Sequence, residues 1–435
     1  MRRLISIAAA ITLLLTLTLT AGAASELPQL HCEAALVVAP ETGFVLYSKN
    51  DLAKRSPSSL VKIMTALVVL ENVDDLTAEV TVSPGAVANL KGLATSSLKE
   101  GEVMSVTNLL YCLLLNSGAD AANALAEYTA GSIPDFVAMM NTRAGELGMT
   151  DTQFANPHGG DDASQYTTAA DLAKLAVAAM KNQQLKDIVE IQYKRIPKTN
   201  KTNVDRYYFS NNALVISSTE RRKTEDYYYR YANGLMTGYS AAAGYNLLAS
   251  SKKDGLTLIT VVLGATRDET SKEKYSYTDA IALMNWGYGN FKLAQLLTKL
   301  EPVTEAPVTL SSTTDSVTLV APDAYTAIIP ADVEPSAMSR EVTVDSPLEA
   351  PLAKGEAVGE IVFSYDGLEY GRSPLVSQSE IERSFLLFAL ARISGFLVGP
   401  WLYASVGGLL FLGGLYAYLT VRMNKRRKSG GKYRG

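Results

Sequence analysis

Cysteine is scarce in this chain, because only Cys32 and Cys112 occur among its 435 residues. Their spacing matches neither a metal-ligand pattern nor a redox pair, and Cys112 lies inside the apolar run 109–115. The sequence therefore excludes a disulfide scaffold and a zinc site, and we expect no metal and no cofactor. A lipid anchor on Cys32 is an alternative, but Leu30 and His31 before it are not the small residues that a lipoprotein signal needs.

Histidine is equally scarce, and the two present are His31, near the N-terminal apolar segment, and His158. A Ser-His-Asp triad would have to use His158, and the chain has no Gly-x-Ser-x-Gly turn to carry its nucleophile. We interpret His158 as a residue that braces a loop through a hydrogen bond. A large charge excess is also missing, since the formal net charge is −4, which argues against a nucleic-acid partner.

The N-terminus has the charged, apolar and small residues of a secretory signal, in that order. Arg2 and Arg3 precede the apolar run 4–19, and Ala21-Gly22-Ala23 follows it. We predict a signal peptide over residues 1–23. A retained N-terminal membrane anchor is the alternative.

The C-terminus carries a second apolar segment, the uncharged stretch 399–421, which is long enough to cross a bilayer as a helix. The basic tail 422–435 follows it, so we expect a single-pass anchor in the cell membrane with everything before it extracytoplasmic. Apolar and charged residues alternate at helical spacing over 380–398. They predict an amphipathic helix on the membrane face, or alternatively a core helix of a second domain.

Between these ends the patterns predict two globular units. Residues 26–291 read as an α/β (α+β) domain, in which helices flank an antiparallel sheet, and 305–378 as a small all-β domain. The expected elements of the first domain are a hairpin over 34–47, a helix over 59–71, a helical region over 108–130 interrupted at 116–120, a helix over 168–180, and strands over 244–249 and 256–263.

Ser59 and Lys62 are three residues apart at the start of a predicted buried helix, so their side chains lie on one face, one turn apart. The Ser59 amide N–H at the helix start points outward, as an oxyanion donor must. Burial would lower the pKa of Lys62 and allow its neutral amine to act as a general base. The pair predicts a serine nucleophile activated by a lysine.

Several segments resemble, in order, those of the low-molecular-mass penicillin-binding proteins, serine-type D-alanyl-D-alanine carboxypeptidases with a β-lactamase-like fold. The resemblance covers about 34–291 and rests on the nucleophile segment Pro57–Leu67, Glu41-Thr42-Gly43 with Leu46-Tyr47, the run Leu113–Gly118, Asp120-Ala121-Ala122, the run Phe154–Gly159 and the run Gly234–Tyr239.

The resemblance implies that Ser59 attacks the peptide bond between two terminal D-alanines of a peptidoglycan stem peptide and that Lys62 takes its proton. Ser117 would relay a proton to the leaving D-alanine. Thr237 and Gly238 would bind the substrate, and the backbone N–H of Tyr239 would complete the oxyanion hole. β-Lactam antibiotics are the expected acylating inhibitors.

Two positions depart from the family pattern. The second motif, Ser-x-Asn in the family, has Ala119 as its third residue here, and the lysine that begins the third motif is replaced by Met236. Each lost contact is worth roughly 1.5–3 kcal/mol, so both together would lower activity roughly 10²–10⁴-fold. Arg267, after the 256–263 strand, could partly replace the missing cation.

These departures keep a rival interpretation open, a weakly active or inactive relative that binds peptidoglycan peptides or scaffolds cell-wall proteins. A β-lactamase or transpeptidase on the same fold would share the acylation step. The tyrosines within 227–231 could line a glycan-facing groove, but we prefer a structural role for them.

Overall fold

The computed structural model describes residues 26–217, 226–345, 347–398 and 400–429. The predicted signal peptide lies outside the described residues. The chain divides into two compact units: residues 1–294 with 328–334, and residues 295–327 with 335–435.

The first unit is built on a five-stranded sheet with the order β2-β1-β9-β8-β7, and every neighbouring pair is antiparallel. Its strands are β1 (Ala34–Ala39), β2 (Phe44–Lys49), β7 (Ala232–Ser240), β8 (Gly244–Lys253) and β9 (Leu256–Ala265). This confirms the predicted hairpin and the two later strands. β7 is an edge strand, which matters for the site described below.

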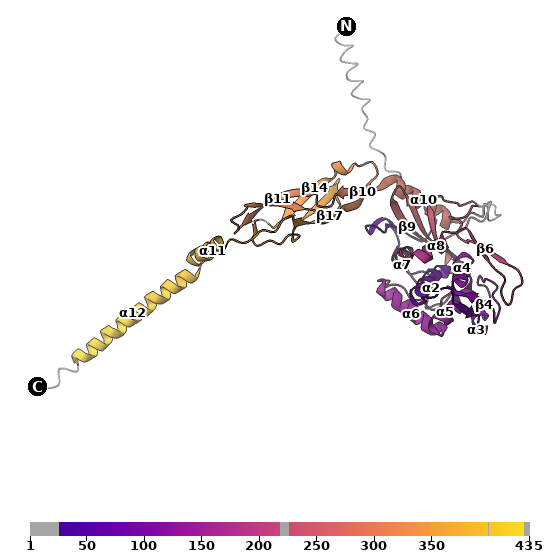
Figure 1. Ribbon diagram of the computed structural model, residues 1–435, viewed down its shortest axis with the longest axis horizontal. Helices are drawn as coiled ribbons and strands as arrows, with labels where there is room; N and C mark the ends of the chain where they lie inside the picture. Colours follow the sequence, from indigo (N-terminus) through magenta and orange to yellow (C-terminus); the bar gives the residue numbers. More distant parts are fainter. Residues whose placement is uncertain (1–25, 218–225, 346, 399, 430–435) are drawn as a thin grey trace, which may run out of the picture. The chain divides into compact units, whose positions relative to one another are not determined.

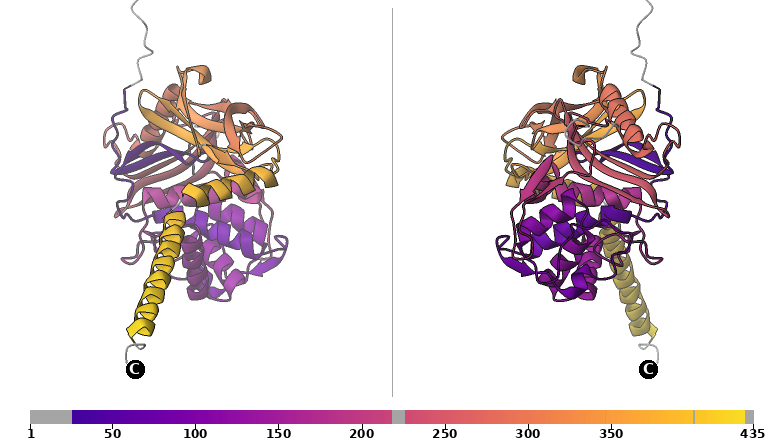
Figure 2. Two further views of the ribbon diagram at one scale, coloured as in Figure 1. Left: turned by 90° about the vertical axis from the view of Figure 1, so that its left-hand side faces the viewer. Right: turned by 90° about the vertical axis from the view of Figure 1, so that its right-hand side faces the viewer.

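Helices cover both faces of this sheet because side chains of alternate residues point to opposite sides of a strand. Ala35 and Val37 pack with helix α10 (Tyr275–Asn290) in one core cluster. Leu36 and Val38 pack in the other cluster with helices α2 (Val61–Asn72) and α7 (Ala169–Lys181). Figure 1 shows α10 on one side of the strands and the remaining helices of the unit on the other, and the right-hand view of Figure 2 shows the same layers turned by 90°.

The helical layer is organised around α2, which is buried from Val61 to Val69 and packs against α4, α5, α6, α7 and α8. These helices are α4 (Val106–Leu115), α5 (Ala119–Ala130), α6 (Ile133–Glu146) and α8 (Gln183–Val189), with the short α3 (Pro84–Val87) beside them. The interruption predicted at 116–120 separates α4 from α5. The helix predicted over 168–180 is α7, whose N-cap Thr168 accepts a hydrogen bond from the Asp171 N–H.

Two short antiparallel pairs complete the first unit. They are β3 (Glu79–Thr81) with β4 (Val103–Ser105), and β5 (Tyr193–Ile196) with β6 (Arg206–Phe209).

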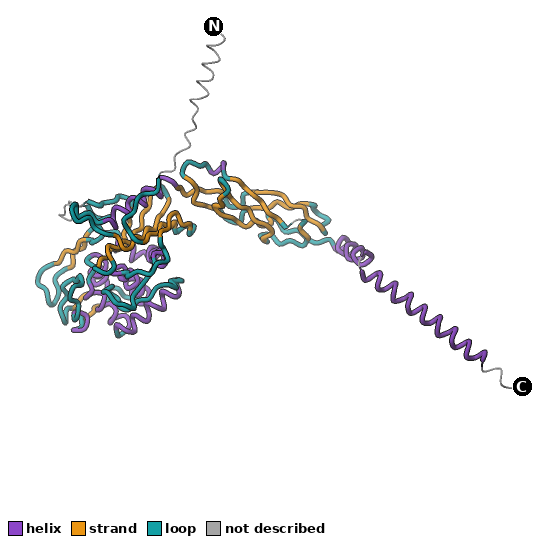
Figure 3. Tube along the Cα trace, turned by 180° about the vertical axis from the view of Figure 1, so that it is seen from behind, coloured by secondary structure: helices purple, strands orange, loops and turns teal. Residues whose placement is uncertain are grey.

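The second unit is rich in strands, as the sequence predicted (Figure 3). Its main sheet has the order β14-β16-β17-β12-β11-β15, and β10 pairs with β13 separately. The buried side chains of Leu319, Ile361, Phe363 and Leu375 belong to its core. The strands of the main sheet are β11 (Pro302–Thr309), β12 (Ser316–Val320), β14 (Ser339–Val344), β15 (Leu348–Glu349), β16 (Ala357–Tyr365) and β17 (Leu368–Ser377). The strands β10 (Phe291–Leu297) and β13 (Tyr325–Pro330) each have residues in both units.

Two helices follow, α11 (Phe385–Val398) and α12 (Pro400–Ser429). Phe385, Leu386 and Ile393 of α11 are exposed, and Arg383 and Arg392 both lie over the Phe388 ring. Within α12, the 24 residues Leu402–Lys425 form one helix long and apolar enough to cross a membrane, with a mean hydropathy of 1.6.

Candidate active site

Ser59 lies in a single 3₁₀ turn, η1 (Ser58–Leu60), directly before α2. The turn is entered through Ser58, whose φ of +46° is unusual for a residue with a side chain. Asn246 of β8 holds this turn, because its Nδ2 donates to the Ser56 carbonyl at 3.0 Å and to Ser58 Oγ at 3.3 Å. The predicted helix therefore begins two residues after Ser59, and the serine sits on a braced turn.

Two glycines allow other segments to approach this turn. A β-carbon at Gly159, which has a φ of +77°, would overlap the Ser58 carbonyl. A β-carbon at Gly238 of β7 would overlap Ser58 Oγ and lie 3.0 Å from the Ser59 amide nitrogen. Backbone without side chains at both positions lets the 154–160 loop and the sheet edge contact the nucleophile turn.

The predicted nucleophile, base and relay residue converge. Lys62 Nζ lies 3.1 Å from Ser59 Oγ, and Ser117 Oγ lies 3.1 Å from the same oxygen. Lys62 Nζ also donates to the His158 carbonyl. Three side chains from two separate segments therefore meet at one hydroxyl group.

Burial sets the electrostatics of this group, since the Lys62 side chain is only 2% exposed. Desolvation lowers the pKa of Lys62 to about 7, and the charge of Asp120 opposes the shift. Near neutral pH a large fraction of this amine is therefore unprotonated and can accept the Ser59 proton.

Ser117 is held in the turn between α4 and α5 with a φ of +56°. The buried Asp120 carboxylate fixes the neighbouring segment by accepting from the N–H groups of Ser96 at 2.8 Å and Leu98 at 2.9 Å. The Asn116 side chain donates to the Thr95 carbonyl at 2.8 Å. Ala119, where the family has asparagine, is buried and offers no polar group.

Strand β7 supplies the other wall of the site. Thr237 and Tyr239 line the cleft, and Thr237 Oγ1 donates to the Asn246 carbonyl at 3.2 Å. Met236 is buried in the larger core cluster instead, so no positive charge stands at its position.

The residues form a cleft of about 890 Å³ that contains all six predicted site residues, Ser59, Lys62, Ser117, Thr237, Gly238 and Tyr239. Arg267 is not part of its lining, and its Nε donates to the Lys272 carbonyl at 3.0 Å. The suggestion that Arg267 supplies the missing cation is not supported. Besides Lys62, the lining contains Lys91 and Lys274, and Lys274 is the N-cap residue of α10.

The sequence alone did not indicate that Asn246 and Lys274 belong to the site. Asn246 is fully buried and also accepts from the Gly264 N–H at 2.9 Å. One amide side chain thus links β8, β9 and the nucleophile turn. The sequence did contain an indication of this role, because Asn246 is a polar residue within an apolar strand. Such a residue is usually a buried amide with its hydrogen bonds made.

His158 has the bracing role predicted for it, because its Nδ1 accepts the Gly160 N–H at 3.0 Å. Burial, with a contribution from Lys62, lowers its pKa to about 4, so the ring is neutral at physiological pH. Tyr227 and Tyr229 are buried in the second core cluster, and Tyr227 stacks on Tyr277 at 4.7 Å. Burial of Tyr227 and Tyr229 agrees with the structural role that we preferred, whereas Tyr228 is 47% exposed.

Within the described parts of the chain, no cluster of three or more His, Cys, Asp or Glu side chains could hold a metal. Both cysteines are buried, and burial raises the pKa of each thiol to about 12.

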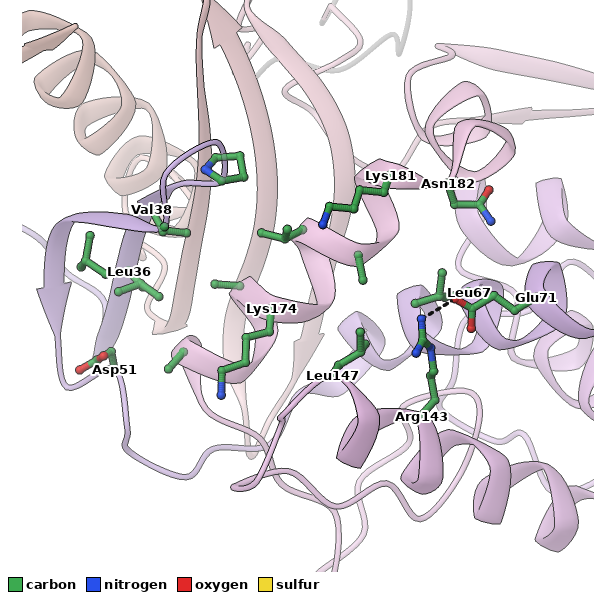
Figure 4. Close-up of a pocket in the computed structure, with 17 residues that line it drawn as sticks. Leu36, Val38, Asp51, Leu67, Glu71, Arg143, Leu147, Lys174, Lys181 and Asn182 are labelled. Carbon is green, nitrogen blue, oxygen red and sulfur yellow. Dashed lines mark hydrogen bonds and ion pairs between the residues drawn. The ribbon is translucent and has the colours of Figure 1, made fainter. Parts of the chain in front are cut away.

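A separate hollow of about 790 Å³ lies between β1, α6 and α7 (Figure 4). Its surface is mainly apolar, and Arg143 beside it is paired with Glu71 at 2.8 Å. It contains none of the six site residues, so the polar cleft at Ser59 is the candidate active site.

A helix-flanked antiparallel sheet with a Ser-x-x-Lys turn beside its edge strand defines a class, the serine enzymes of β-lactamase-like fold. Residues 21–267 match the family described as D-alanyl-D-alanine carboxypeptidase, and 291–383 match the C-terminal domain of penicillin-binding protein 5. The chain belongs to the D-alanyl-D-alanine carboxypeptidase family.

Individual relatives agree with this assignment. The chain is 31% identical to D-alanyl-D-alanine carboxypeptidase DacC of Escherichia coli over 82% of its own length and 86% of the relative's. Its fold is similar to penicillin-binding protein 5 of Haemophilus influenzae, with a TM-score of 0.68, 27% identity, and coverage of 82% of this chain and 99% of that one. It is also similar to the Streptomyces K15 DD-transpeptidase, with a TM-score of 0.54, 30% identity, and coverage of 60% and 99%.

Proposed function

We propose that this protein removes the terminal D-alanine from peptidoglycan stem peptides as a serine-type D-alanyl-D-alanine carboxypeptidase. The observation that carries the proposal is the convergence of Lys62 Nζ and Ser117 Oγ on Ser59 Oγ, each at 3.1 Å, inside the cleft bounded by β7. Family membership indicates the substrate class, peptides that end in D-alanyl-D-alanine. The geometry supports the proposed chemistry, attack by a serine that a lysine activates.

Acylation begins when neutral Lys62 takes the Ser59 proton and Oγ attacks the carbonyl carbon of the penultimate D-alanine. The backbone N–H groups of Ser59 and Tyr239 stabilise the oxyanion. Ser117 passes a proton to the departing nitrogen and receives in turn the proton that Lys62 took, so that the C–N bond breaks, free D-alanine leaves and Lys62 is neutral again. Neutral Lys62 then takes a proton from the water that attacks the ester, and returns it to Ser59 Oγ as the bond between Oγ and the acyl carbon breaks, which regenerates Ser59.

The substrate carboxylate needs donors in the cleft. The Thr237 hydroxyl becomes such a donor by turning away from the Asn246 carbonyl, and Lys274 on the cleft lining supplies positive charge that Met236 does not. A charge-assisted contact from Lys274 offsets part of the loss caused by Met236. β-Lactams, which also carry a carboxylate, acylate Ser59 by the same first step.

The cellular setting follows from the chain ends. The apolar part of α12 anchors the protein in the cell membrane, and the basic residues at the C-terminal end of this helix remain cytoplasmic, so the cleft is extracytoplasmic. The apolar helix Leu402–Lys425 and the predicted signal peptide support this topology.

The test is acylation of the purified protein by a labelled penicillin, together with D-alanine release from a peptide ending in D-alanyl-D-alanine. Both should occur and both should vanish in Ser59→Ala. Labelling without release would indicate an acylating site that has lost turnover. Absence of both would favour the rival interpretation, a binding or scaffold protein, for which buried Ala119 and Met236 are the specific observations.

A further inference from the structure

The hairpin formed by β5 and β6 has an exposed aromatic face that the chemistry at Ser59 does not use. The register pairs Tyr193 with Phe209 and Arg195 with Tyr207, so these four side chains share one face. Tyr193 is 53% exposed, Tyr207 56% and Phe209 41%. The rings of Tyr193 and Phe209 lie 5.6 Å apart.

The opposite face of the hairpin holds it in place. Ile196 is fully buried, Tyr208 donates to the Ser96 carbonyl at 2.6 Å, and Lys194 lies over the Tyr111 ring. Arg206 pairs with the buried Glu102 carboxylate. The exposed rings are therefore presented by a fixed support, which lowers the entropy cost of binding to them.

The face is close to the catalytic cleft along the chain. Two residues after Phe209, Asn211 lines that cleft, and its N–H donates to the Leu115 carbonyl at 3.0 Å. The Ser210 N–H donates to the Gln192 carbonyl at 2.8 Å, which fixes the link. Two residues of chain span at most about 8 Å, so the backbone of Phe209 lies within that distance of Asn211 and a ligand leaving the cleft there has the rings nearby.

The chemistry of the face suits a neutral, hydroxyl-rich ligand. Two tyrosines offer flat apolar rings that also carry hydroxyl groups. Arg195, the cation on this face, is paired with Asp205 at 2.6 Å, so no unpaired charge here favours an anionic lipid or a nucleic acid. Sugar rings present apolar C–H faces between hydroxyl groups and match this surface.

We infer that the face formed by Tyr193, Arg195, Tyr207 and Phe209 binds the glycan strand that carries the stem peptide. The inference rests on the proposed function for its substrate class. It adds a second contact, through which the enzyme holds polymeric peptidoglycan while the cleft holds the peptide end.

The first experiment measures binding without turnover. Full-length protein carrying Ser59→Ala, in detergent micelles, is sedimented with insoluble peptidoglycan and with glycan strands stripped of their peptides. We expect the protein to bind both materials. The double variant Tyr193→Ala with Tyr207→Ala should bind each of them roughly tenfold or more weakly. Tyr128→Ala, which changes a 41% exposed tyrosine on α5, is the control and should leave binding unchanged. Tyr207→Phe keeps the ring and should retain binding.

The second experiment separates this inference from the proposed function. In the protein with Ser59 intact, the double variant should release D-alanine from a short synthetic peptide at an unchanged rate but have a raised KM for polymeric peptidoglycan. Failure of the parent protein to bind peptide-free glycan, or equal binding by the double variant, would overturn the inference. The inference would also be overturned if the double variant lost binding to anionic lipid vesicles and kept its binding to glycan. Failure of the parent to hydrolyse the short peptide would overturn the proposed function alone.

Discussion

At the scale of single residues, the buried amine of Lys62 decides when the site can react. Its pKa is lowered to about 7, so the fraction of neutral amine rises as pH increases through that value. We predict that the rate of acylation by a labelled penicillin falls about tenfold per pH unit below about 7 and levels off above it. A rate that is flat from pH 5 to 9 would argue that Lys62 is not the base.

The replacement of the third-motif lysine by Met236 makes Lys274 the residue to test for carboxylate binding. Lys274→Met should raise KM roughly tenfold for a peptide with a free terminal carboxylate, and should change little for the same peptide with a terminal amide. Arg267→Met is the matched control, because Arg267 does not line the cleft. Introducing Met236→Lys into the Lys274→Met variant should restore part of the loss. An equal effect on amide and acid peptides would exclude a carboxylate contact.

At the scale of elements, strand β8 positions the nucleophile turn through Asn246. Asn246→Ala removes its hydrogen bonds to Ser56, Ser58 and Gly264, and should lower the free energy of unfolding by about 2–4 kcal/mol and slow acylation. Ser250→Ala is a close control, because Ser250 is buried on the same strand and its hydroxyl has no hydrogen-bond partner among the described residues. Thermal unfolding and penicillin labelling measure both effects. Equal stability and equal penicillin labelling of Asn246→Ala and Ser250→Ala would show that Asn246 does not position the site.

The close approach of β7 to the nucleophile turn predicts a strict requirement for Gly238. Gly238→Ala should reduce penicillin acylation roughly a hundredfold, because the new methyl group must displace Ser58 and with it Ser59. Gly145→Ala in α6 is the control, since a β-carbon there meets nothing within 4 Å. Normal labelling of Gly238→Ala would show that the turn can move without loss of activity.

The elements that sequence predicted are those with strong local signals. The 34–47 hairpin has a glycine turn between apolar runs, and the turn at 116–120 has small and polar residues between two apolar helices. Helix α10 was not predicted, because its pattern is weak and its Tyr277, Leu283 and Met284 become apolar contacts only when packed on the sheet. Tertiary burial outweighed local propensity there.

The candidate site shows the same limit. Ser59 and Lys62 are neighbours in sequence, so their pairing could be predicted from helix geometry. Asn246 and Lys274 reach the nucleophile region only through the order of the strands and the start of α10, which a single sequence does not reveal. The catalytic roles of Ser59, Lys62 and Ser117 stay predictions until the variants are measured.

At the scale of the whole molecule, α12 should control where the protein is found. The full chain should sediment with membranes, and a chain ending at Val398 should be recovered in the soluble fraction with its penicillin labelling intact. Leu409→Arg with Leu412→Arg keeps the length of the chain but places two charges in the apolar segment Leu402–Lys425, and should release it as well. Membrane sedimentation of the truncated chain would instead assign the association to α11 or to the N-terminus.

The sheet order ends at β7, and this position has a consequence for recognition. An edge strand keeps a row of backbone donors and acceptors that no neighbouring strand of its sheet uses, which most proteins must shield against aggregation. Here that row borders the cleft, where an extended peptide can add as a sixth strand. Main-chain pairing of this kind depends on the path and configuration of the peptide backbone rather than on the bulk of its side chains. A wall made of backbone therefore suits a substrate whose last two residues carry only methyl groups and differ from ordinary protein chains in configuration.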